Sequence, residues 1–315
     1  MKFKPIRFIP DDTRFPIMRL SRFGFFVSGL LSLASVLLFV FVGLNVGVDF
    51  KGGTVMTIRT ADAANIEQLR EQVSSLGFGQ AEIQEFGSPR DVLIRLPAVE
   101  GGDEAQQTTI AKVKEALGPG VEFRSVEVVG PKVSSELAEQ SILAVVFAIG
   151  GILFYVWFRF EWQFGVGAIW SLVHDVTLTF GLFSLTGWEF DLNIIAALLT
   201  IIGYSLNDKV VIDDRIRENL RKYRQMDIKQ IIDLSVNETL PRTVMTSVTL
   251  LAALIALLFL GPEVIFGFTA AMVLGIVVGT YSSIFVSSSL LITLGVKQRA
   301  AGSEDARAKG AERIG

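Results

Sequence analysis

The stretch GFFVSGLLSLASVLLFVFVGL at residues 24–44 decides the class of this protein, because its 21 residues carry no charge. A helix rises about 1.5 Å per residue, so this segment is long enough to cross a hydrocarbon core of about 30 Å. Six basic residues precede it, as in a signal peptide. The run is too long for a signal peptide, however, and no small-residue cleavage site follows. Residues 24–44 are therefore predicted to form a transmembrane helix.

Composition excludes several other classes of protein. The chain has 315 residues, of which 50% are hydrophobic and 19% charged, and it contains no cysteine. This hydrophobic content is too high for a disordered protein, and a disulfide scaffold or a cysteine-ligated metal site is excluded. The formal net charge of −3 argues against nucleic acid as a partner, since phosphate binding needs a basic face.

Five further apolar runs predict a protein with six transmembrane helices. They lie at 140–158, at 163–188, from 192 onward, at 243–262 and within 264–296. The regions rich in lysine and arginine all fall on one side of such a topology, which the positive-inside rule makes the cytoplasm. Both termini are then cytoplasmic, and the long loop after the first helix faces the periplasm.

These boundaries give the predicted organisation of the chain. It comprises a cytoplasmic segment at 1–23, transmembrane helix 1 at 24–44, a periplasmic α+β domain at 45–139, helices 2–4 at 140–212, a cytoplasmic connector at 213–242, helices 5–6 at 243–296 and a cytoplasmic tail at 297–315. In the connector, residues 214–222 are predicted to extend helix 4. An amphipathic stripe at 228–235 is typical either of a helix on the membrane surface or of a packed connector.

The periplasmic loop has the pattern β-α-β-β-α-β, the split ferredoxin-like order. Strands are predicted at 53–59, 80–86, 91–96 and 121–129, with helices at 63–76, where Asp62 is the expected N-cap, and at 103–117. The loop contains neither histidine nor cysteine, and its carboxylates are scattered. A binding or docking module is therefore favoured over an enzyme, and no metal site or cofactor is predicted.

Charged residues lie inside two of the predicted spans. Residues 192–207 rise only about 24 Å as a helix, so Asp208 and Lys209 fall within the membrane or at its inner edge. Asp175, beside His174, is placed near mid-membrane. A charged Asp at the bilayer centre costs about 2.5–3.5 kcal/mol, and such residues mark ion or proton pathways. The alternatives are a static ion pair for Asp208 and a packing role for Asp175.

Three further features bear on this site. Arg242 precedes the fifth run at a depth that matches Asp208, so it is either an ion-pair partner of that carboxyl or an ordinary interfacial anchor. Lys209 is predicted to extend to the interface. Gly275 and Gly279 form a GxxxG spacing that favours close helix contact.

Several motifs now give a resemblance to a known family. They are Asp49-Phe-Lys-Gly-Gly-Thr54, Val129-Gly-Pro131, His174-Asp-Val176, Gly203-Tyr-Ser-Leu-Asn-Asp208 and Asp214-Arg-Ile-Arg-Glu-Asn219. Together they resemble the SecD/SecF family of bacterial protein-export membrane proteins, on its SecF side, over nearly the whole chain. The resemblance implies membership of the resistance-nodulation-division superfamily.

The resemblance also implies a function. Six helices would form half of a pseudo-symmetric twelve-helix bundle with SecD, beside the SecYEG translocon in the inner membrane, with YajC as a further partner. The unit would couple proton flow to late translocation or release of preproteins at the periplasmic side. The proton-relay residues implied are Asp208 and Arg242; Asp175, His174 and Asn207 would support the relay or the packing; and Asp49, Gly52 and Gly53 belong to a family motif.

Other functions are distinguished by specific features. A proton-driven small-solute exporter of the same superfamily would share the relay, but an outer domain of about 90 residues is too small for a drug-sized pocket. An intramembrane protease would need Ser205 with His174 as a dyad, or Asp175 with Asp208 sharing a proton. A structural assembly factor would tolerate loss of Asp208. The sequence favours a translocation subunit over an enzyme.

Overall fold

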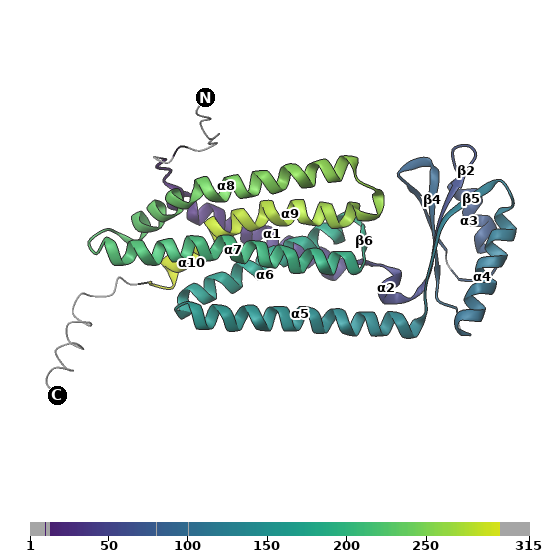
Figure 1. Ribbon diagram of the computed structural model, residues 1–315, viewed down its shortest axis with the longest axis horizontal. Coiled ribbons are helices and arrows are strands. Elements are labelled where there is room, and N and C mark those ends of the chain that lie inside the picture. The colour runs from purple at the N-terminus through teal and green to yellow at the C-terminus, as the bar shows by residue number, and fades with distance from the viewer. Residues whose placement is uncertain (1–9, 11–12, 80, 100, 297–315) are drawn as a thin grey trace, which may run out of the picture.

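The computed structural model describes residues 10, 13–79, 81–99 and 101–296, and it consists of a helical bundle with a sheet domain at one end (Figure 1). Within that part of the chain, six helical segments are long and apolar enough to cross a membrane. They are α1 (Ser21–Phe41), α5 (Pro131–Arg159), α6 (Trp162–Thr186), α7 (Leu192–Lys222), α8 (Ile228–Leu260) and α9 (Phe266–Ser282) with its flanking turns. The prediction of a six-span protein with a small α+β domain is confirmed.

The last span has an irregular second half. The turns η1 (Ile17–Leu20) and η2 (Glu263–Ile265) precede α1 and α9, and α9 continues through a π-helical segment, η3 (Ser283–Ser287), into α10 (Ser288–Thr293). Isolated π turns are rare in helices and are frequent at functional sites. This one faces α6, as the position of Ser287 shows: a Cβ added to Gly167 would lie 2.9 Å from the Ser287 hydroxyl.

Local sequence explains where the spans begin and end. Pro131 occupies the first turn of α5, where its missing N–H leaves no helical hydrogen bond unmade. The side chain of Asp191 accepts a hydrogen bond of 3.1 Å from the Ile194 amide and so caps α7. Gly187 ends α6 in the left-handed conformation, at φ +69°, which a residue with a Cβ adopts only with strain.

The predicted connector at 213–242 is largely helical. α7 and α8 continue well past their apolar runs, and residues 223–227 join them. Ile216 on α7 and Ile232 on α8 are both buried in one apolar cluster, and the Asn219 amide donates to the Ser235 hydroxyl at 3.0 Å. Residues 228–235 therefore pack against α7, as the alternative of a packed connector predicts.

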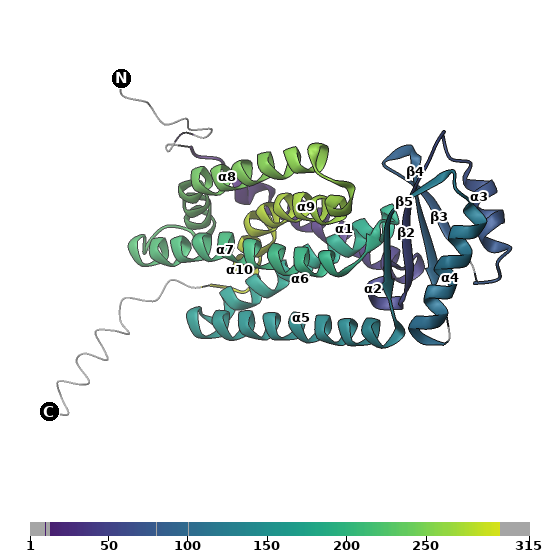
Figure 2. The same ribbon diagram turned by 45° about the vertical axis from the view of Figure 1, so that its right-hand side comes forward.

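Close packing of α7 and α9 forms the centre of the bundle. A Cβ added to Gly275 would lie 2.3 Å from Cγ1 of Ile201, and one added to Gly279 would lie 3.2 Å from Cβ of Ser205. The two glycines of the GxxxG spacing thus permit the contact predicted for them. In Figures 1 and 2, α5 and α8 lie on opposite sides of the bundle, with the other spans between them.

The outer domain has a four-stranded antiparallel sheet. Its elements are β2 (Gly53–Thr60), α3 (Ile66–Ser74), β3 (Glu82–Phe86), β4 (Ser88–Pro97), α4 (Gly102–Leu117) and β5 (Val121–Val129), and the strand order is β3-β4-β2-β5. Met56 pairs with Ile94 on one side and with Val126 on the other. In both views α3 and α4 lie on the face of the sheet that points away from the bundle.

The element order β-α-β-β-α-β agrees with the sequence pattern, but the first helix begins later than expected. Asn65, not Asp62, is the N-cap of α3, and its side chain accepts a hydrogen bond of 3.1 Å from the Gln68 amide. The chain bends between β2 and α3, because Thr60 bonds to the carbonyl of Asp62 at 2.6 Å. Either residue type is a good cap, so sequence alone left this boundary open.

A charged pair fastens β2 to β4, the two central strands of the sheet. Arg59 donates two hydrogen bonds to Asp91, at 2.7 and 2.6 Å, and the Ser88 hydroxyl donates a third at 2.7 Å. These donors, Arg59 first, hold the pKa of Asp91 well below its ordinary range. The stabilisation is therefore complete above about pH 4 and is lost as acid protonates the folded carboxyl.

Substituting Asp91→Asn should loosen β2 and β4 at pH 7, which we expect as faster hydrogen–deuterium exchange of both strands in the purified full-length protein. Below about pH 4 the carboxyl of the unfolded parent chain takes up a proton that the folded one resists, so the difference should shrink as the pH falls. Glu85→Gln, at an exposed position on β3, is the matched control. Equal exchange of parent and variant at pH 7, or an undiminished difference at pH 3, would contradict this role.

Candidate functional site

Asp175 on α6 lies at a junction of three helices. Its side chain is 1% exposed, and Oδ2 accepts hydrogen bonds from Ser205 on α7 at 2.6 Å and from Ser282 at the end of α9 at 2.9 Å. Oδ1 lies 3.0 Å from Nδ1 of His174. Asp175 therefore ties α6, α7 and α9 together, which is the packing role considered for it.

Asp208 lies one helix interface away, between α7 and α8. It is buried, and Oδ1 accepts a hydrogen bond of 2.6 Å from the Thr243 hydroxyl. Oδ2 is also buried and has no hydrogen-bond partner among the described residues. This carboxyl is thus removed from water, and only one of its two oxygens is satisfied by a hydrogen bond.

The predicted ion pair between Asp208 and Arg242 is not formed among the described residues. Thr243 faces Asp208 instead, and the Arg242 side chain is exposed. Adjacent residues on a helix point about 100° apart, so Thr243 forms the hydrogen bond to Asp208 while Arg242 acts on it only as a more distant charge. A rotation of α8 about its axis would exchange them.

Lys209 enters the bundle rather than the interface, so the prediction that it extends outward is wrong. Its side chain is 1% exposed, and Nζ donates a hydrogen bond of 2.5 Å to the hydroxyl of Ser171 on α6. The reason is that α7 runs 13 residues beyond Lys209, to Lys222. At this point along α7 the ammonium is covered by α6, which contributes Ser171.

Three carboxyls surround this ammonium. Asp175, Asp208 and Asp213 all lie within electrostatic range of Lys209, and Asp213 is itself 2% exposed with an unpartnered Oδ1. We call these four residues and His174 the interior polar cluster. Sequence analysis had placed Asp213 at the start of the cytoplasmic connector and did not predict its burial.

Charge balance limits the states of the interior polar cluster. A buried charge without a partner costs several kcal/mol, and Lys209 balances only one of the three carboxylates. Two further cations act on these carboxyls from nearby, because Arg242 lies within electrostatic range of Asp208 and Arg217 within range of Asp213. Nε2 of His174 is buried and has no hydrogen-bond partner among the described residues.

Serines of the last span complete the surroundings of the cluster, and sequence reasoning missed them. Ser282, Ser283 and Ser287 are each at most 1% exposed, and the hydroxyls of Ser283 and Ser287 have no partner among the described residues. The signal was the density of serine at 282–289 within an uncharged run. A serine hydroxyl readily bonds to the backbone of its own helix. The density of serines alone therefore did not predict which way their side chains face.

The remaining predicted residues lie outside the cluster. Asn207 is exposed on α7, because its helical position faces away from Asp208. Ser205 and His174 both contact Asp175 and not each other, so the Ser–His dyad of a protease is absent. No group of three or more metal-ligating side chains is found in the part of the chain that the structure describes.

Asp49, Gly52 and Gly53 form the joint between the bundle and the outer domain. Asp49 lies on α2 (Val48–Lys51), and its Oδ2 accepts a hydrogen bond of 3.0 Å from the Leu192 amide at the start of α7. Gly52 and Gly53 have φ of +72° and +135°. A Cβ at Gly53 would lie 2.3 Å from the Leu96 carbonyl oxygen, so only glycine allows β2 to pair with β4 from its first residue.

Two further contacts hold the sheet to the bundle. The short strands β1 (Asn45–Val46) and β6 (Glu189–Phe190) pair in parallel, and Arg95 on β4 forms an ion pair with Glu189. Burial raises the pKa of Glu189, against the opposing effect of Arg95. The outer domain is therefore fastened to the turn that begins α7, the helix that carries Asp208 and Lys209.

Comparison with known proteins identifies the family that has this arrangement. The model "Protein export membrane protein SecD/SecF, C-terminal" matches residues 109–297, and the "SecD/SecF GG Motif" matches residues 37–64, which include the glycine joint. The chain belongs to the SecD/SecF family. The resemblance drawn from the motifs is thereby confirmed.

Relatives within the SecD/SecF family cover the whole architecture. Protein translocase subunit SecF of Rickettsia rickettsii is 43% identical over 298 residues, 92% of this chain and 95% of that protein. SecF of Vibrio alginolyticus is 44% identical over 283 residues, 89% of this chain and 90% of that protein. The match to SecDF of Brucella abortus, 41% identical, covers 96% of this chain but 40% of that protein.

A solved member of the SecD/SecF family has the same fold. The crystal structure of SecDF from Thermus, described as a translocon-associated membrane protein, superposes with a TM-score of 0.81 at 38% identity. The match covers 92% of this chain and 40% of that one. This chain therefore spans about two fifths of the SecDF structure, and its function in the Sec protein-export pathway is that of an accessory translocation subunit.

Substituting Gly53→Ala should destabilise the joint, because the new Cβ would displace the Leu96 carbonyl and the backbone is strained for any residue but glycine. We expect a loss of about 1–3 kcal/mol in the unfolding free energy of the outer domain, measured by denaturant-dependent hydrogen exchange. Gly120→Ala is the control, because a Cβ there meets open space. Equal stability of the two variants would show that the close approach is not required.

Proposed function

We propose that this chain works with SecD as one half of a twelve-helix unit beside the SecYEG translocon and couples proton flow to the late steps of preprotein export. The relatives support the partnership, since SecDF proteins contain a region matching this chain within a longer polypeptide. Contacts with YajC and with preproteins remain predictions. The proton-relay role of Asp208 is the centre of the proposal.

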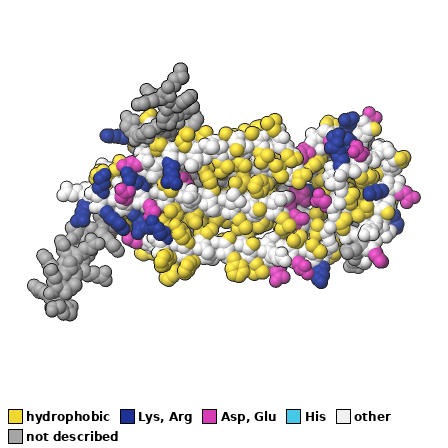
Figure 3. Space-filling model, in the orientation of Figure 1, with side chains coloured by type: hydrophobic (Ala, Val, Ile, Leu, Met, Phe, Trp, Pro, Cys, Tyr) yellow, Lys and Arg dark blue, Asp and Glu magenta, His cyan; other side chains and the backbone are white. Residues whose placement is uncertain are grey.

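The charge distribution supports the proposed orientation of the chain in the inner membrane. In Figure 3, lysine and arginine side chains gather at the bundle end opposite the sheet domain, and acidic side chains are prominent where the bundle meets that domain. The positive-inside rule assigns the basic end to the cytoplasm. The sheet domain then lies in the periplasm, where a preprotein emerges.

The half-satisfied carboxyl of Asp208 is the observation that carries the relay. One of its oxygens is held by Thr243, while the other is buried without a partner among the described residues. Gaining or losing a proton there changes the net charge of the interior polar cluster by one unit. Since the cluster contains one lysine against three carboxyls, each step alters the attraction between α7 and its neighbours.

The energy available to this step is modest but sufficient to select between two arrangements. One proton that crosses a potential of 100 mV releases about 2.3 kcal/mol, which shifts a two-state equilibrium by roughly 50-fold. Rotation of α8 about its axis would replace Thr243 by Arg242 opposite Asp208. We assign Arg242 this role: its cation meets the carboxylate after the proton has left.

α7 transmits the change to the outer domain. Asp208 lies 16 residues from Leu192, about 24 Å along the helix, and the Leu192 amide is held by Asp49 of the glycine joint. A shift of α7 is therefore applied directly to α2, β1 and β6, and through Arg95 to β4. In this proposal the periplasmic sheet moves with the protonation cycle.

Replacing Asp208→Asn should reduce export of a reporter preprotein to the level seen without a proton gradient, while membrane insertion stays unchanged. Asparagine keeps the size of the side chain but removes the exchangeable proton. Export should be measured in cells depleted of their own SecD and SecF and supplied with both proteins. Asp62→Asn, at an exposed position, is the control. Normal proton-dependent export by Asp208→Asn would disprove the relay.

Charge balance makes a second prediction. Lys209→Met leaves three buried carboxyls without their lysine, so export should fall sharply and the yield of folded protein should drop. The double variant Lys209→Met with Asp213→Asn removes one charge of each sign and should recover part of both. If Asp213→Asn worsens the lysine variant, Lys209 does not serve as the counter-ion of the interior polar cluster.

A further inference from the structure

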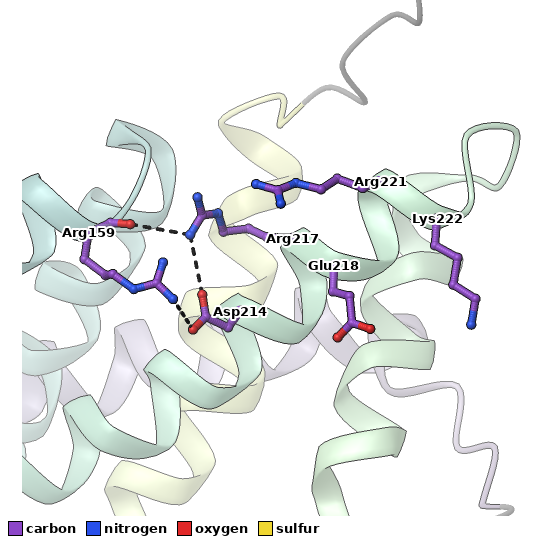
Figure 4. A pocket seen from close by; sticks show the side chains of 6 residues that line it. All are labelled: Arg159, Asp214, Arg217, Glu218, Arg221 and Lys222. Atoms are coloured by element: carbon purple, nitrogen blue, oxygen red, sulfur yellow. Dashed lines mark hydrogen bonds and ion pairs between the residues drawn. The ribbon is translucent and has the colours of Figure 1, made fainter.

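The wide basic pocket at the cytoplasmic end of the bundle is not used by the proposed relay. It lies between the end of α5 and the last turns of α7, and its volume is about 440 Å³. Figure 4 shows the side chains that line it: Arg159, Asp214, Arg217, Glu218, Arg221 and Lys222. Four of these six are cationic, so the pocket has a formal charge of +2.

Two of the guanidinium groups are fixed in position. Arg159 donates a hydrogen bond of 2.6 Å to Oδ2 of Asp214, and Arg217 lies 3.4 Å from Oδ1 of the same carboxylate. Both also lie over the ring of Phe160, at 5.1 and 5.5 Å from its centroid. Aromatic and carboxylate contacts restrict the rotamers of both side chains, so a ligand would lose little side-chain entropy on binding them.

The other two cations form no ion pair among the described residues, and Lys222 Nζ lies 5.0 Å from the ring centroid of Tyr223. Arg221 and Lys222 are exposed, and the ion pairs within the described residues include neither of them. Glu218, the remaining acid of the pocket, pairs with Arg215 at 2.6 Å. The positive charge of the pocket is therefore not neutralised from within, and the ligand that fits it is an anion with several acceptor oxygens.

The depth of the pocket identifies the source of that anion. The uncharged run before Arg159 has 19 residues, about 29 Å of helix, which matches the hydrocarbon thickness of about 30 Å. Asp214 lies 22 residues from Leu192, about 33 Å along α7. Trp157, Phe158 and Trp162 next to the pocket are 77%, 81% and 64% exposed, and such aromatic belts mark the membrane interface.

We propose that this pocket binds the phosphate of an anionic membrane lipid. Arg159 and Arg217 would hold the phosphate oxygens, Arg221 and Lys222 would contribute further charge, and the acyl chains would lie against the apolar surface of α5. Basic pockets between spans on the cytoplasmic side suit anionic headgroups. The bound lipid would bridge α5 and α7 at the end opposite the glycine joint. This inference does not depend on the proton relay.

The test measures lipid binding to the intact protein in detergent, with no proton gradient. Native mass spectrometry should show phosphatidylglycerol bound in clear preference to phosphatidylcholine. In the variant Arg221→Gln with Lys222→Gln, affinity for phosphatidylglycerol should fall about tenfold or more, as expected for losing two charge-assisted contacts. Both positions are exposed, so the fold should be retained. Arg217→Lys should also weaken binding, because it keeps the charge but loses the planar fork.

A control of equal charge separates a site from a diffuse basic surface. Arg224→Gln with Lys229→Gln changes two exposed cations outside the pocket and should leave binding within about twofold of the parent. Equal weakening by both double variants would overturn the proposal. Displacement of the lipid by millimolar inorganic phosphate would overturn it as well, because the site would then take a soluble anion. Equal binding of both lipids would have the same consequence.

Discussion

A lysine that shares a water-excluded space with three carboxyls is the constraint on which this membrane bundle depends. Lys209 compensates one negative charge, and the low dielectric of the surroundings penalises any other imbalance. The serines and threonine that bond to Asp175, Asp208 and Lys209 satisfy part of each group without carrying charge. In the proposed relay, proton number and helix arrangement are linked, because moving one proton changes which polar contacts are favourable.

The position of this cluster on α7 explains why the rest of the chain is built around that helix. α9 approaches it closely at Gly275, α8 contributes Thr243, and α6 covers Lys209. The outer end of α7 is capped by Asp49 and lies next to the strand pair that holds the sheet domain. A single rigid helix thus connects a site of charge change in the membrane with a domain outside it.

Much of this architecture could be predicted from sequence, for a physical reason. Apolar runs of membrane length are unambiguous, and Asp175 and Asp208 stood out because each interrupts such a run. Directions around a helix were harder: Lys209 points inward and Arg242 outward because of one-residue differences in rotation that no periodicity recorded. The serines of the last span were missed for a related reason, since a hydroxyl in a helix is satisfied equally well by its own backbone.

Carbodiimide labelling of the membrane-embedded protein, located by mass spectrometry, tests the central claim most directly. The reagent modifies carboxyls that hold a proton in apolar surroundings. The account predicts modification of Asp208 near neutral pH, with exposed acids such as Asp62 and Asp227 left unmodified. It also predicts that dissipating the proton gradient changes the labelling rate at Asp208 and leaves that of the exposed acids unchanged. Labelling that spares Asp208, or that treats it like the exposed acids, would contradict a protonatable carboxyl at the core of the bundle.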